Sequence, residues 1–548
     1  MHRREKGGLD RRRLFQGALA AGLCNVTAGA LSGCRPPCPP FGQWNNAVGT
    51  QSARPSLIMF PTTAGELAGV VRQAESAGKR VRMTGSGHSF SDIALTDDYL
   101  LLPGRLDALL DLDRTKLKPA VADDRQLVRA QSGITIRKLN ADLDQRGLAL
   151  ENLGGYDGQT IAGVAMTATH GSGLRYGPIA SQIVSLQLVS VGGEVLQIEP
   201  TAGITDPQRH TGRLDEDPHV SVRLVQRDDW FDAVTVSLGC MGIVYSVVLR
   251  AVTKYWIHER RSIVPWSELA RPDGVIDRLI GGKKLNDQGG PDPDHYEIYV
   301  NPYPTRRSGA GPDHTCIYTE RYRLDAPPPP TSDSAQRGRV GTGNLLANPV
   351  ARHLAEDTLR SFLDAANGDL LHEFHDGLLE YLEDDDYTDL SYKVFNLGDA
   401  NRFRVYGIEM AFGLEQTVAA TERMFELAAW NESQNRHHTV PVSLRFVAPS
   451  RSPLAMQHGR KTCMMEIGML VGQNGAGALL ESYETAFVRD FGARPHWGLD
   501  LNVLKSEADV ARLYPAWPAW KAVYATLNAK GTFDGRVTDR LGISVRRR

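Results

Sequence analysis

The sequence predicts a mixed helix-and-sheet protein of the α+β class, built from several structural units. Its 548 residues correspond to roughly three or four domains at about 150 residues each. Hydrophobic residues make up 41% of the chain and charged residues 23%, so the chain can bury a large core. Helical and strand-like segments follow one another along most of the chain, with glycine-rich turns between several of them.

The first predicted unit begins with a helix whose start and end are both marked. Thr63 and Glu66 have the spacing of a capping box, with Thr63 as the N-cap. Apolar residues then recur at helical spacing until Gly78 ends the helix. Further elements are expected in this order: strand 80–84, helix 135–146, strands 183–190 and 194–198, and a turn with a buried strand over 239–252.

Other stretches are read from their composition. Residues 200–229 are polar and are expected to form an irregular insertion. Residues 327–344 are rich in Pro, Ser and Gly and are predicted to form a surface loop or linker. The acidic residues 383–386 are expected in a solvated loop. After residue 254, strand-like segments alternate with helical ones, including strand 296–300 and helices 351–366 and 415–430.

Charge and cysteine usage exclude several classes of protein. The 62 basic and 64 acidic residues give a net charge of −2, which provides no basic surface for nucleic acid. The six cysteines are too few for a disulfide scaffold, and without CxxC spacing they indicate no metal site. Spanning a bilayer takes about 20 apolar residues, and no stretch of the chain reaches that length.

Residues 1–33 are expected to be an export segment. Arg11-Arg12-Arg13-Leu14-Phe15 and the mild apolar run after it resemble a twin-arginine signal. The run ends in Leu-Ser-Gly-Cys, which resembles a bacterial lipobox with Cys34 as the lipidated residue. The alternative, a buried N-terminal helix, is disfavoured by the prolines that follow at once. We therefore expect an exported protein held at a membrane surface of the bacterial envelope through Cys34, with a tether over 34–54.

Two glycine-rich loops in the first unit suggest an anion-binding site, because glycine lets backbone N–H groups approach a phosphate closely. Neither loop has the spacing of a dinucleotide-binding or P-loop motif. The full strings are more specific: TGSGHSFSDIA at 84–94, GYDGQTIAG at 155–163, TATHGSG at 167–173 and SLGCMGIV at 237–244. In order and spacing they resemble the FAD-binding domain of the vanillyl-alcohol oxidase superfamily. Within it they are nearest the sugar-1,4-lactone oxidase and alditol oxidase branch.

The resemblance covers residues 55–253 and returns at 496–498 and 531–534. It implies a two-part PCMH-type FAD-binding domain over 55–253, followed by a cap domain over 254–480 with a large antiparallel sheet and helices. Residues 481–548 would form a C-terminal segment that completes the active site.

The resemblance also implies which residues hold FAD. His88 occupies the position of the histidine that bonds covalently to the flavin, and a neutral imidazole is a suitable nucleophile. The linkage is expected to be single, because the second loop contains no cysteine. The other implied FAD-binding residues are Gly85, Ser86, Gly87, Ser89, Gly155, Thr160, Gly163, Thr167, His170, Gly171, Gly173, Gly239, Gly242 and Ile243. No metal is expected.

Flavin chemistry requires a group for the hydroxyl proton and a cation near the reduced flavin. The resemblance assigns the cation to Arg445 and places Ser172 near flavin N5, with His496 close by. The family's glutamate and lysine positions hold Ser443 and Leu499, which removes two polar groups and favours a less polar alcohol. Glu297 and Glu466 are the possible substitute bases.

We therefore expect an FAD-dependent oxidoreductase that oxidises a CH–OH group of a small alcohol, polyol or sugar lactone by hydride transfer to N5. Dioxygen or another acceptor would reoxidise the flavin. One alternative is an envelope flavin-binding or electron-transfer protein without alcohol turnover. Another is a structural lipoprotein without a cofactor.

Overall fold

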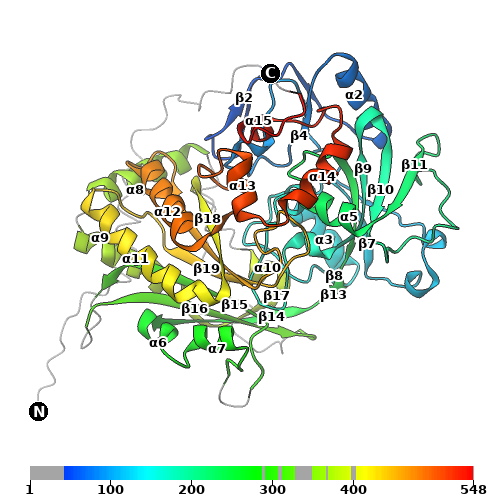
Figure 1. The fold of residues 1–548 in the computed structure, drawn as a ribbon. Coiled ribbons are helices and arrows are strands. Elements are labelled where there is room, and N and C mark those ends of the chain that lie inside the picture. Colours follow the sequence, from blue (N-terminus) through cyan, green and yellow to red (C-terminus); the bar gives the residue numbers. More distant parts are fainter. Residues whose placement is uncertain are drawn as a thin grey trace, which may run out of the picture.

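The computed structural model describes residues 42–286, 290–305, 311–327, 349–365, 368–396 and 403–546, and Figure 1 shows its ribbon. Helices and sheets are mixed throughout, which confirms the α+β class. The expected export segment, Cys34, the beginning of the tether and residues 328–344 of the expected linker lie outside the described residues.

The first unit is built on two sheets. A three-stranded parallel sheet has the order β3-β5-β4, and a six-stranded sheet has the order β11-β10-β9-β12-β7-β6. The strands are β3 (Leu57–Met59), β4 (Val81–Met83), β5 (Tyr99–Leu101), β6 (Leu109–Leu110), β7 (Leu127–Gln131), β9 (Ile183–Val189), β10 (Val195–Glu199), β11 (Val222–Gln226) and β12 (Ile243–Arg250). The helices are α2 (Ala64–Ser76), α3 (Ile136–Gln145), α4 (Ile161–Met166) and α5 (Asp228–Thr235). Two short strand pairs are β1 (Trp44–Asn45) with β2 (Ser52–Ala53), and β8 (Leu148–Ala149) with β13 (Val252–Thr253).

The helices of this unit begin where the sequence predicts. The Thr63 hydroxyl accepts a hydrogen bond from the backbone N–H of Glu66, so Thr63 is the N-cap of α2. The return bond of the expected capping box is shifted by one residue, because the Glu66 carboxylate accepts from the N–H of Thr62 at 2.7 Å. Thr135 caps α3 in the same way as Thr63 caps α2.

One composition-based expectation holds only in part, since residues 200–221 are irregular but a strand follows them, and another is wrong. Within residues 200–229, strand β11 pairs in parallel with β10 and forms the edge of the six-stranded sheet. Residues 384–386 begin strand β17, which pairs with β14 rather than forming a loop. Both strands lie at a sheet edge, where a strand pairs with only one neighbour, and each stands beside polar residues, so the composition of the segment resembles that of a loop.

The second unit holds an eight-stranded antiparallel sheet in the order β17-β14-β16-β15-β19-β20-β18-β21. The strands are β14 (Trp256–Pro265), β15 (His295–Thr305), β16 (Asp313–Leu324), β17 (Asp384–Leu390), β18 (Val405–Gly413), β19 (Val442–Val447), β20 (Thr462–Leu470) and β21 (Arg494–Pro495). Its helices are α6 (Trp266–Ala270), α7 (Val275–Gly281), α8 (Pro349–Ala365), α9 (Gly368–Leu382), α10 (Ser391–Phe395), α11 (Thr417–Ser433) and α12 (Ala476–Phe491).

The two faces of this sheet have different surroundings. One face is apolar and packs against helices α9, α11 and α12, which lie together on one side of the sheet in Figure 1. Phe412 of β18, for example, meets Phe487 of α12 with ring centroids 5.0 Å apart. Because side chains alternate along a strand, the neighbouring positions point to the other face, which turns toward the first unit. This second face carries the polar residues described below.

The C-terminal residues return to the first unit. Helix α12 runs across the boundary expected between residues 480 and 481, and α13 (Glu507–Leu513), α14 (Trp517–Leu527) and α15 (Arg536–Arg540) follow, in red in Figure 1. The N–H of Val81 in β4 donates to the carbonyl of Thr532 at 2.8 Å. Arg540 forms a two-pronged ion pair with Asp92, with both N–O distances 2.8 Å.

The described residues contain neither a membrane-spanning helix nor a metal-binding cluster. Among these residues, no helix combines the length and the hydropathy that a membrane crossing requires. Within the same ranges, no cluster of three or more histidine, cysteine, aspartate or glutamate side chains is arranged to hold a metal ion.

Candidate active site

A cavity in the first unit is enclosed by three segments that the fold brings together. The loop after β4, residues 84–89, forms one wall, and residues 159–169 around α4 form a second. Residues 238–244, which lead into β12, form a third. The space inside the cavity measures about 110 Å³.

The shape of this cavity depends on residues without side chains. A Cβ on Gly85 would lie 2.3 Å from the Thr160 hydroxyl, so only glycine allows this loop to approach α4 so closely. Gly242 has a φ of +144°, and a Cβ there would lie 2.7 Å from the side chain of Leu188. Two non-glycine residues near the cavity, Ala168 and Leu238, also have left-handed backbones, at φ +57° and +56°. Such strained residues cluster at ligand sites.

His88 lies on the first wall with a half-buried ring. Its ring centroid is 4.4 Å from that of Tyr156 and 5.4 Å from that of Phe90. Burial lowers the pKa of His88 to about 4, so the imidazole is neutral at pH 7. A neutral ring nitrogen that borders a ligand cavity is chemically able to act as a nucleophile.

The lining also contains buried polar atoms that lack partners within the described structure. They are the Ser132 hydroxyl and the Nε of Arg82. A buried polar group without a hydrogen bond costs free energy, and a bound polar molecule can supply the missing bond. Glycine loops that present backbone N–H groups, hydroxyl side chains and these two atoms together fit a ligand with phosphates and a polar ring system, as FAD has.

Most of the residues predicted to bind FAD border the cavity. They are His88, Gly85, Ser86, Gly87, Ser89, Thr160, Gly163, Thr167, Gly239, Gly242 and Ile243. Gly155, His170, Gly171 and Gly173 do not border it. The last three belong to the end of the second loop, which the fold directs toward the large sheet of the second unit. The N–H of Gly173 donates to the carbonyl of Phe446 in β19 at 2.6 Å.

The Ser172 hydroxyl is bound by two strands of the large sheet. Its hydroxyl donates to the carbonyl of Tyr296 in β15 and accepts from the N–H of Phe446 in β19 at 3.1 Å. The side chain is buried and does not border the cavity. Ser172 therefore joins the loop 167–173 to the large sheet.

The sheet face that turns toward this loop carries a row of ionised side chains, one or two from each of six neighbouring strands. We call it the charged row, and its members are Arg261 and Glu259 of β14, Arg321 of β16, Glu297 of β15, Arg445 of β19, Glu466 of β20 and Glu409 of β18. Strand register aligns them: Glu259 pairs with Arg321, Glu297 with Arg445, and Glu466 with Glu409. A buried row of this kind requires mutual neutralisation.

The carboxylates of the charged row on β14 and β15 are neutralised by ion pairs. Glu259 binds Arg321 at 2.7 Å and Arg261 at 2.9 Å. Glu297 lies between two guanidiniums, 3.0 Å from Arg445 and 3.3 Å from Arg321. Burial alone would raise the pKa of Glu297, but these two cations lower it, so the carboxylate stays ionised and saturated with partners. This leaves Glu297, a predicted base, poorly suited to accept a proton.

On β18, at the other end of the charged row, Glu409 contacts His170 of the FAD-binding unit. The His170 Nδ1 lies 2.8 Å from the Gly171 carbonyl, and its Nε2 lies 3.2 Å from a carboxylate oxygen of Glu409. Since a carbonyl only accepts, Nδ1 carries a hydrogen, and a further proton must lie between Nε2 and the carboxylate. Burial raises the pKa of Glu409, but His170 and Arg445 outweigh it and bring the pKa to about 2. The Glu409 carboxylate is therefore ionised where it contacts His170.

His496 connects the cavity with this pair. Its ring borders the cavity, and its Nδ1 accepts the N–H of Gly498 at 3.0 Å. Its backbone N–H donates to the carbonyl of Glu409 at 2.9 Å, and its ring centroid is 6.2 Å from that of His170. Burial lowers the pKa of His496 to about 4, so its ring is neutral at pH 7. Leu499 also borders the cavity, with an apolar side chain.

Glu409 is the functional residue that the sequence interpretation missed. It is a single carboxylate in an otherwise apolar strand, Tyr406–Phe412, and Glu466 has the same setting in β20. An isolated acid inside an apolar strand predicts a buried charge, and a buried charge needs a partner. That signal was present for Glu409, but its partner is 239 residues away in the chain.

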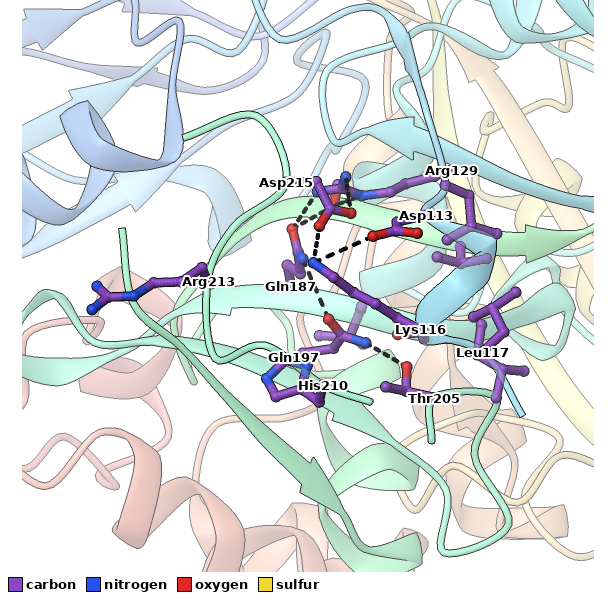
Figure 2. Close-up of a pocket in the computed structure, with 16 residues that line it drawn as sticks. Asp113, Lys116, Leu117, Arg129, Gln187, Gln197, Thr205, His210, Arg213 and Asp215 are labelled. Carbon is purple, nitrogen blue, oxygen red and sulfur yellow. Dashed lines mark hydrogen bonds and ion pairs between the residues drawn. The ribbon is translucent and has the colours of Figure 1, made fainter. Parts of the chain in front are cut away.

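A second cavity, of about 30 Å³, lies on the six-stranded sheet, away from the first (Figure 2). Its charged side chains are neutralised by ion pairs: Lys116 pairs with Asp215 and with Asp113, and Arg129 pairs with Glu216 at 2.8 Å. Figure 2 shows Arg213 directed away from this network. The cavity has room for about one water molecule, and its charges are already paired, so it is not a ligand site.

The fold, the cavity and the charged row together define an FAD-dependent oxidoreductase. Comparison with known families agrees: residues 55–199 match the FAD binding domain family, and residues 343–541 match the D-arabinono-1,4-lactone oxidase family. The chain is therefore similar to FAD-linked oxidoreductases over these two ranges, and its loop sequences predict the same resemblance.

Named relatives span nearly the whole chain. The chain is 29% identical to L-gulono-1,4-lactone dehydrogenase of Mycobacterium tuberculosis, over 91% of this chain and 98% of that protein. It is 26% identical to L-gulonolactone oxidase of Mus musculus, over 90% and 96%. D-arabinono-1,4-lactone oxidase of Yarrowia lipolytica is 33% identical over 41% of this chain and 37% of its own length.

Among solved structures, cholesterol oxidase from Brevibacterium sterolicum shares the fold. The TM-score is 0.65 at 13% sequence identity, over 93% of this chain and all of that one. A solvent-stable cholesterol oxidase gives a TM-score of 0.62 at 15% identity. These likenesses describe the architecture, in which an FAD-binding unit faces a large antiparallel sheet.

Proposed function

We propose that the protein oxidises a secondary alcohol carbon of a small polyhydroxylated substrate, a sugar 1,4-lactone, at a flavin bound in the cavity. The observation that carries this proposal is the charged row, which presents Arg445 and Glu466 on the sheet face beside the FAD-binding loops. A polar face of this kind suits hydroxyl-rich substrates. It replaces the polar groups whose absence at Ser443 and Leu499 suggested a less polar alcohol. The full-length relatives named for gulonolactone support the same class.

The chain's own residues would divide the work between the two units. The glycine loops and hydroxyls of the cavity would hold FAD, and the flavin would supply a two-electron acceptor for hydride. Arg445 provides a fixed positive charge with several N–H donors for substrate oxygens. Its ion pairs with Glu297 and Glu466 hold the guanidinium in one orientation. His496 separates the flavin cavity from the His170–Glu409 pair and restricts water there.

The test is anaerobic reduction of the purified flavoprotein. L-gulono-1,4-lactone, D-arabinono-1,4-lactone, a polyol and a simple secondary alcohol would each be mixed with the protein while the flavin absorption band is recorded. We expect bleaching with a lactone and slower or no bleaching with the simple alcohol. If no CH–OH compound bleaches the band, while dithionite does, the flavin-binding or electron-transfer alternative would be preferred.

We also propose that the flavin is attached covalently through His88. The neutral, half-buried imidazole at the cavity wall supports this linkage. After acid precipitation, wild-type protein should retain yellow colour in the pellet, whereas His88→Ala should release its flavin to the supernatant. His219→Ala makes the same change at an exposed position outside the cavity; it is the matched control and should retain the flavin. Release of flavin by the wild type would rule out the covalent bond.

The sequence supports a cellular location as a further proposal. We propose that the chain is exported by the twin-arginine route and anchored by lipid on Cys34 at a membrane surface of the bacterial envelope. Cys34→Ala should then move the protein from the membrane fraction to the soluble fraction without changing its flavin content. The electron acceptor is dioxygen or a membrane-associated oxidant, and the rate of flavin reoxidation in air distinguishes them.

A further inference from the structure

We propose that Glu466 is the catalytic residue that accepts the hydroxyl proton of the substrate. The inference rests on the proposed function, and it assigns the base for that reaction. It comes from the placement of Glu466 on β20, at the same level of the sheet as Ser443 on β19 and Glu409 on β18. Arg445 lies two residues further along β19, on the same face.

Glu466 is the most accessible carboxylate of the charged row. Four carboxylates belong to the charged row, and three are almost completely buried: the side chains of Glu259, Glu297 and Glu409 are 2%, 4% and 4% exposed. The side chain of Glu466 is 36% exposed. A base must reach the proton that it removes, and of these four only Glu466 is open to a molecule from outside.

Glu466 also has an oxygen that is able to accept a further hydrogen bond. Glu259 and Glu297 each contact two guanidiniums, and Glu409 is held by His170 through Oε2, while its buried Oε1 has no hydrogen bond within the described residues. Glu466 binds Arg445 through Oε2. Within the described part of the chain, its Oε1 accepts no hydrogen bond. Glu466 therefore combines an anchored oxygen, which fixes its orientation, with a second oxygen that can accept a proton.

Ser443 is the neighbour of Glu466 on the sheet. In the register of the sheet Ser443 is the direct partner of Glu466, so their Cβ atoms are about 4.5–5.5 Å apart. The buried Ser443 hydroxyl has no hydrogen-bond partner within the described residues. A substrate oxygen placed over the face that β19 and β20 share would reach the Ser443 hydroxyl, the Arg445 guanidinium and Oε1 of Glu466 together.

The charges that face Glu466 favour this role. They come from Arg445 on β19, Glu297 on β15, Glu409 on β18 and His170 on the FAD-binding loop. Partial burial and the two neighbouring carboxylates raise the pKa of Glu466 despite Arg445 and His170. Proton transfer is most efficient when the pKa of the base lies near the working pH. Glu297 and Glu409 have lowered pKa values and are weaker bases.

Oxidation of the CH–OH group transfers one hydride and one proton. The substrate carbon gives up its hydrogen together with the two electrons of the C–H bond, as hydride, to the oxidised flavin. The hydroxyl proton moves to Oε1 of Glu466, and the electrons of the O–H bond form the second carbon–oxygen bond. The products are a carbonyl compound, a two-electron-reduced flavin and a protonated Glu466, which returns its proton to solvent through its exposed side.

The test uses Glu466→Gln in the full, flavin-loaded protein. Glutamine keeps the size of the side chain and an oxygen for Arg445, but it cannot take up the proton. The rate of anaerobic flavin reduction by L-gulono-1,4-lactone should fall by about 10²–10⁴-fold, the usual contribution of a general base. In the wild type this rate should rise with pH and level off above the pKa of Glu466, whereas Glu466→Gln should show no such rise.

Three controls isolate the proton transfer. Glu320→Gln makes the same change on strand β16 of the same sheet, outside the charged row, and should be reduced at the wild-type rate. Flavin content and reduction by dithionite should be unchanged in Glu466→Gln. If that variant fails to hold flavin, Glu466→Asp keeps an ionisable group and should keep the pH dependence at a lower rate.

The outcomes separate the two proposals. If the lactone reduces the wild type and Glu466→Gln at rates within threefold of each other, Glu466 is not the base, while the proposed function stands. A slowed Glu466→Gln that still follows the wild-type pH profile would also overturn the assignment. If no CH–OH compound reduces the wild type, the proposed function and the assignment both fail.

Discussion

A single proton between His170 and Glu409 joins the two units of the protein. Both side chains are nearly inaccessible, 1% and 4% exposed. His170 and Arg445 both lie against the Glu409 carboxylate of the charged row, which has four carboxylates and three guanidiniums. An ion pair in such a setting offsets its own desolvation only if both partners remain. The pair therefore acts as a connection between the FAD-binding loop and the sheet that carries Arg445 and Glu466.

At this scale we predict a large difference between two substitutions of Glu409. Glu409→Ala leaves the buried ring nitrogen of His170 without a partner and Arg445 with less compensation, at a cost of about 3–5 kcal/mol. Glu409→Gln lets the amide N–H donate to a neutral His170, so it should cost only about 1 kcal/mol. Urea unfolding of the flavin-loaded proteins measures both. Equal losses would show that no proton is held between these residues.

At the scale of elements, the cavity depends on the close approach of the loop after β4 to the start of α4. The contact is Gly85 against Thr160, and Thr160 is also the N-cap of α4, because its hydroxyl accepts the N–H of Gly163 at 3.3 Å. One hydroxyl therefore both begins the helix and sets the width of the cavity. The left-handed residues Ala168 and Leu238 lie in the segments that complete the lining.

We predict that Gly85→Ala and Thr160→Ala are coupled. Gly85→Ala places a methyl group against the Thr160 hydroxyl and should lower flavin content, with a loss of about 1–3 kcal/mol in stability. Thr160→Ala alone removes the cap and should cost about 1 kcal/mol. Because it also removes the clashing oxygen, the double variant should hold more flavin than Gly85→Ala. The ratio of flavin to protein absorbance tests this, and a double variant no better than Gly85→Ala would contradict the packing argument.

At the scale of the whole molecule, burial keeps several histidines neutral. Burial lowers the pKa of His295, His375 and His438 to about 3, 4 and 3. His375 and His438 lie between α9 and the large sheet, where His375 Nε2 donates to the carbonyl of His438 at 3.1 Å. His295 packs on Tyr176 of the FAD-binding unit with ring centroids 4.4 Å apart. The charged forms of these rings are therefore compatible only with an opened structure.

We predict a steep loss of stability in acid. The unfolded chain binds protons on these histidines below about pH 6.5, whereas the folded chain resists until about pH 3–4. Each histidine then removes about 1.4 kcal/mol of stability per pH unit across that window. Glu409 acts in the same direction, since its lowered pKa gives stability that is lost as pH falls toward about 2.

The measurement is the free energy of unfolding in urea between pH 7 and pH 4. His375→Gln keeps an N–H donor but cannot be protonated, so its stability should fall with a slope about 1.4 kcal/mol per pH unit shallower than that of the wild type. His219→Gln, at an exposed position, is the matched control and should leave the slope unchanged. An identical slope for His375→Gln would show that His375 does not remain neutral in the folded protein.

The sequence by itself determined the features that depend on neighbouring residues. Threonine caps at Thr63 and Thr135 begin helices because the hydroxyl and the N–H groups that it binds lie within one turn. The glycine loops around His88 and Thr160 are likewise encoded by short runs of consecutive residues. Those runs indicate the resemblance to the family, the FAD-binding unit and most of the cavity lining.

Only the tertiary structure decided what the polar residues do. Ser172 lies in a string that implies contact with the flavin, yet strands β15 and β19 take up its hydroxyl. Glu409 and Glu466 look alike in sequence, but register places one behind His170 and leaves the other open beside Ser443. The physical reason is that burial, pairing and pKa depend on which strands lie side by side, and those partners come from distant parts of the chain.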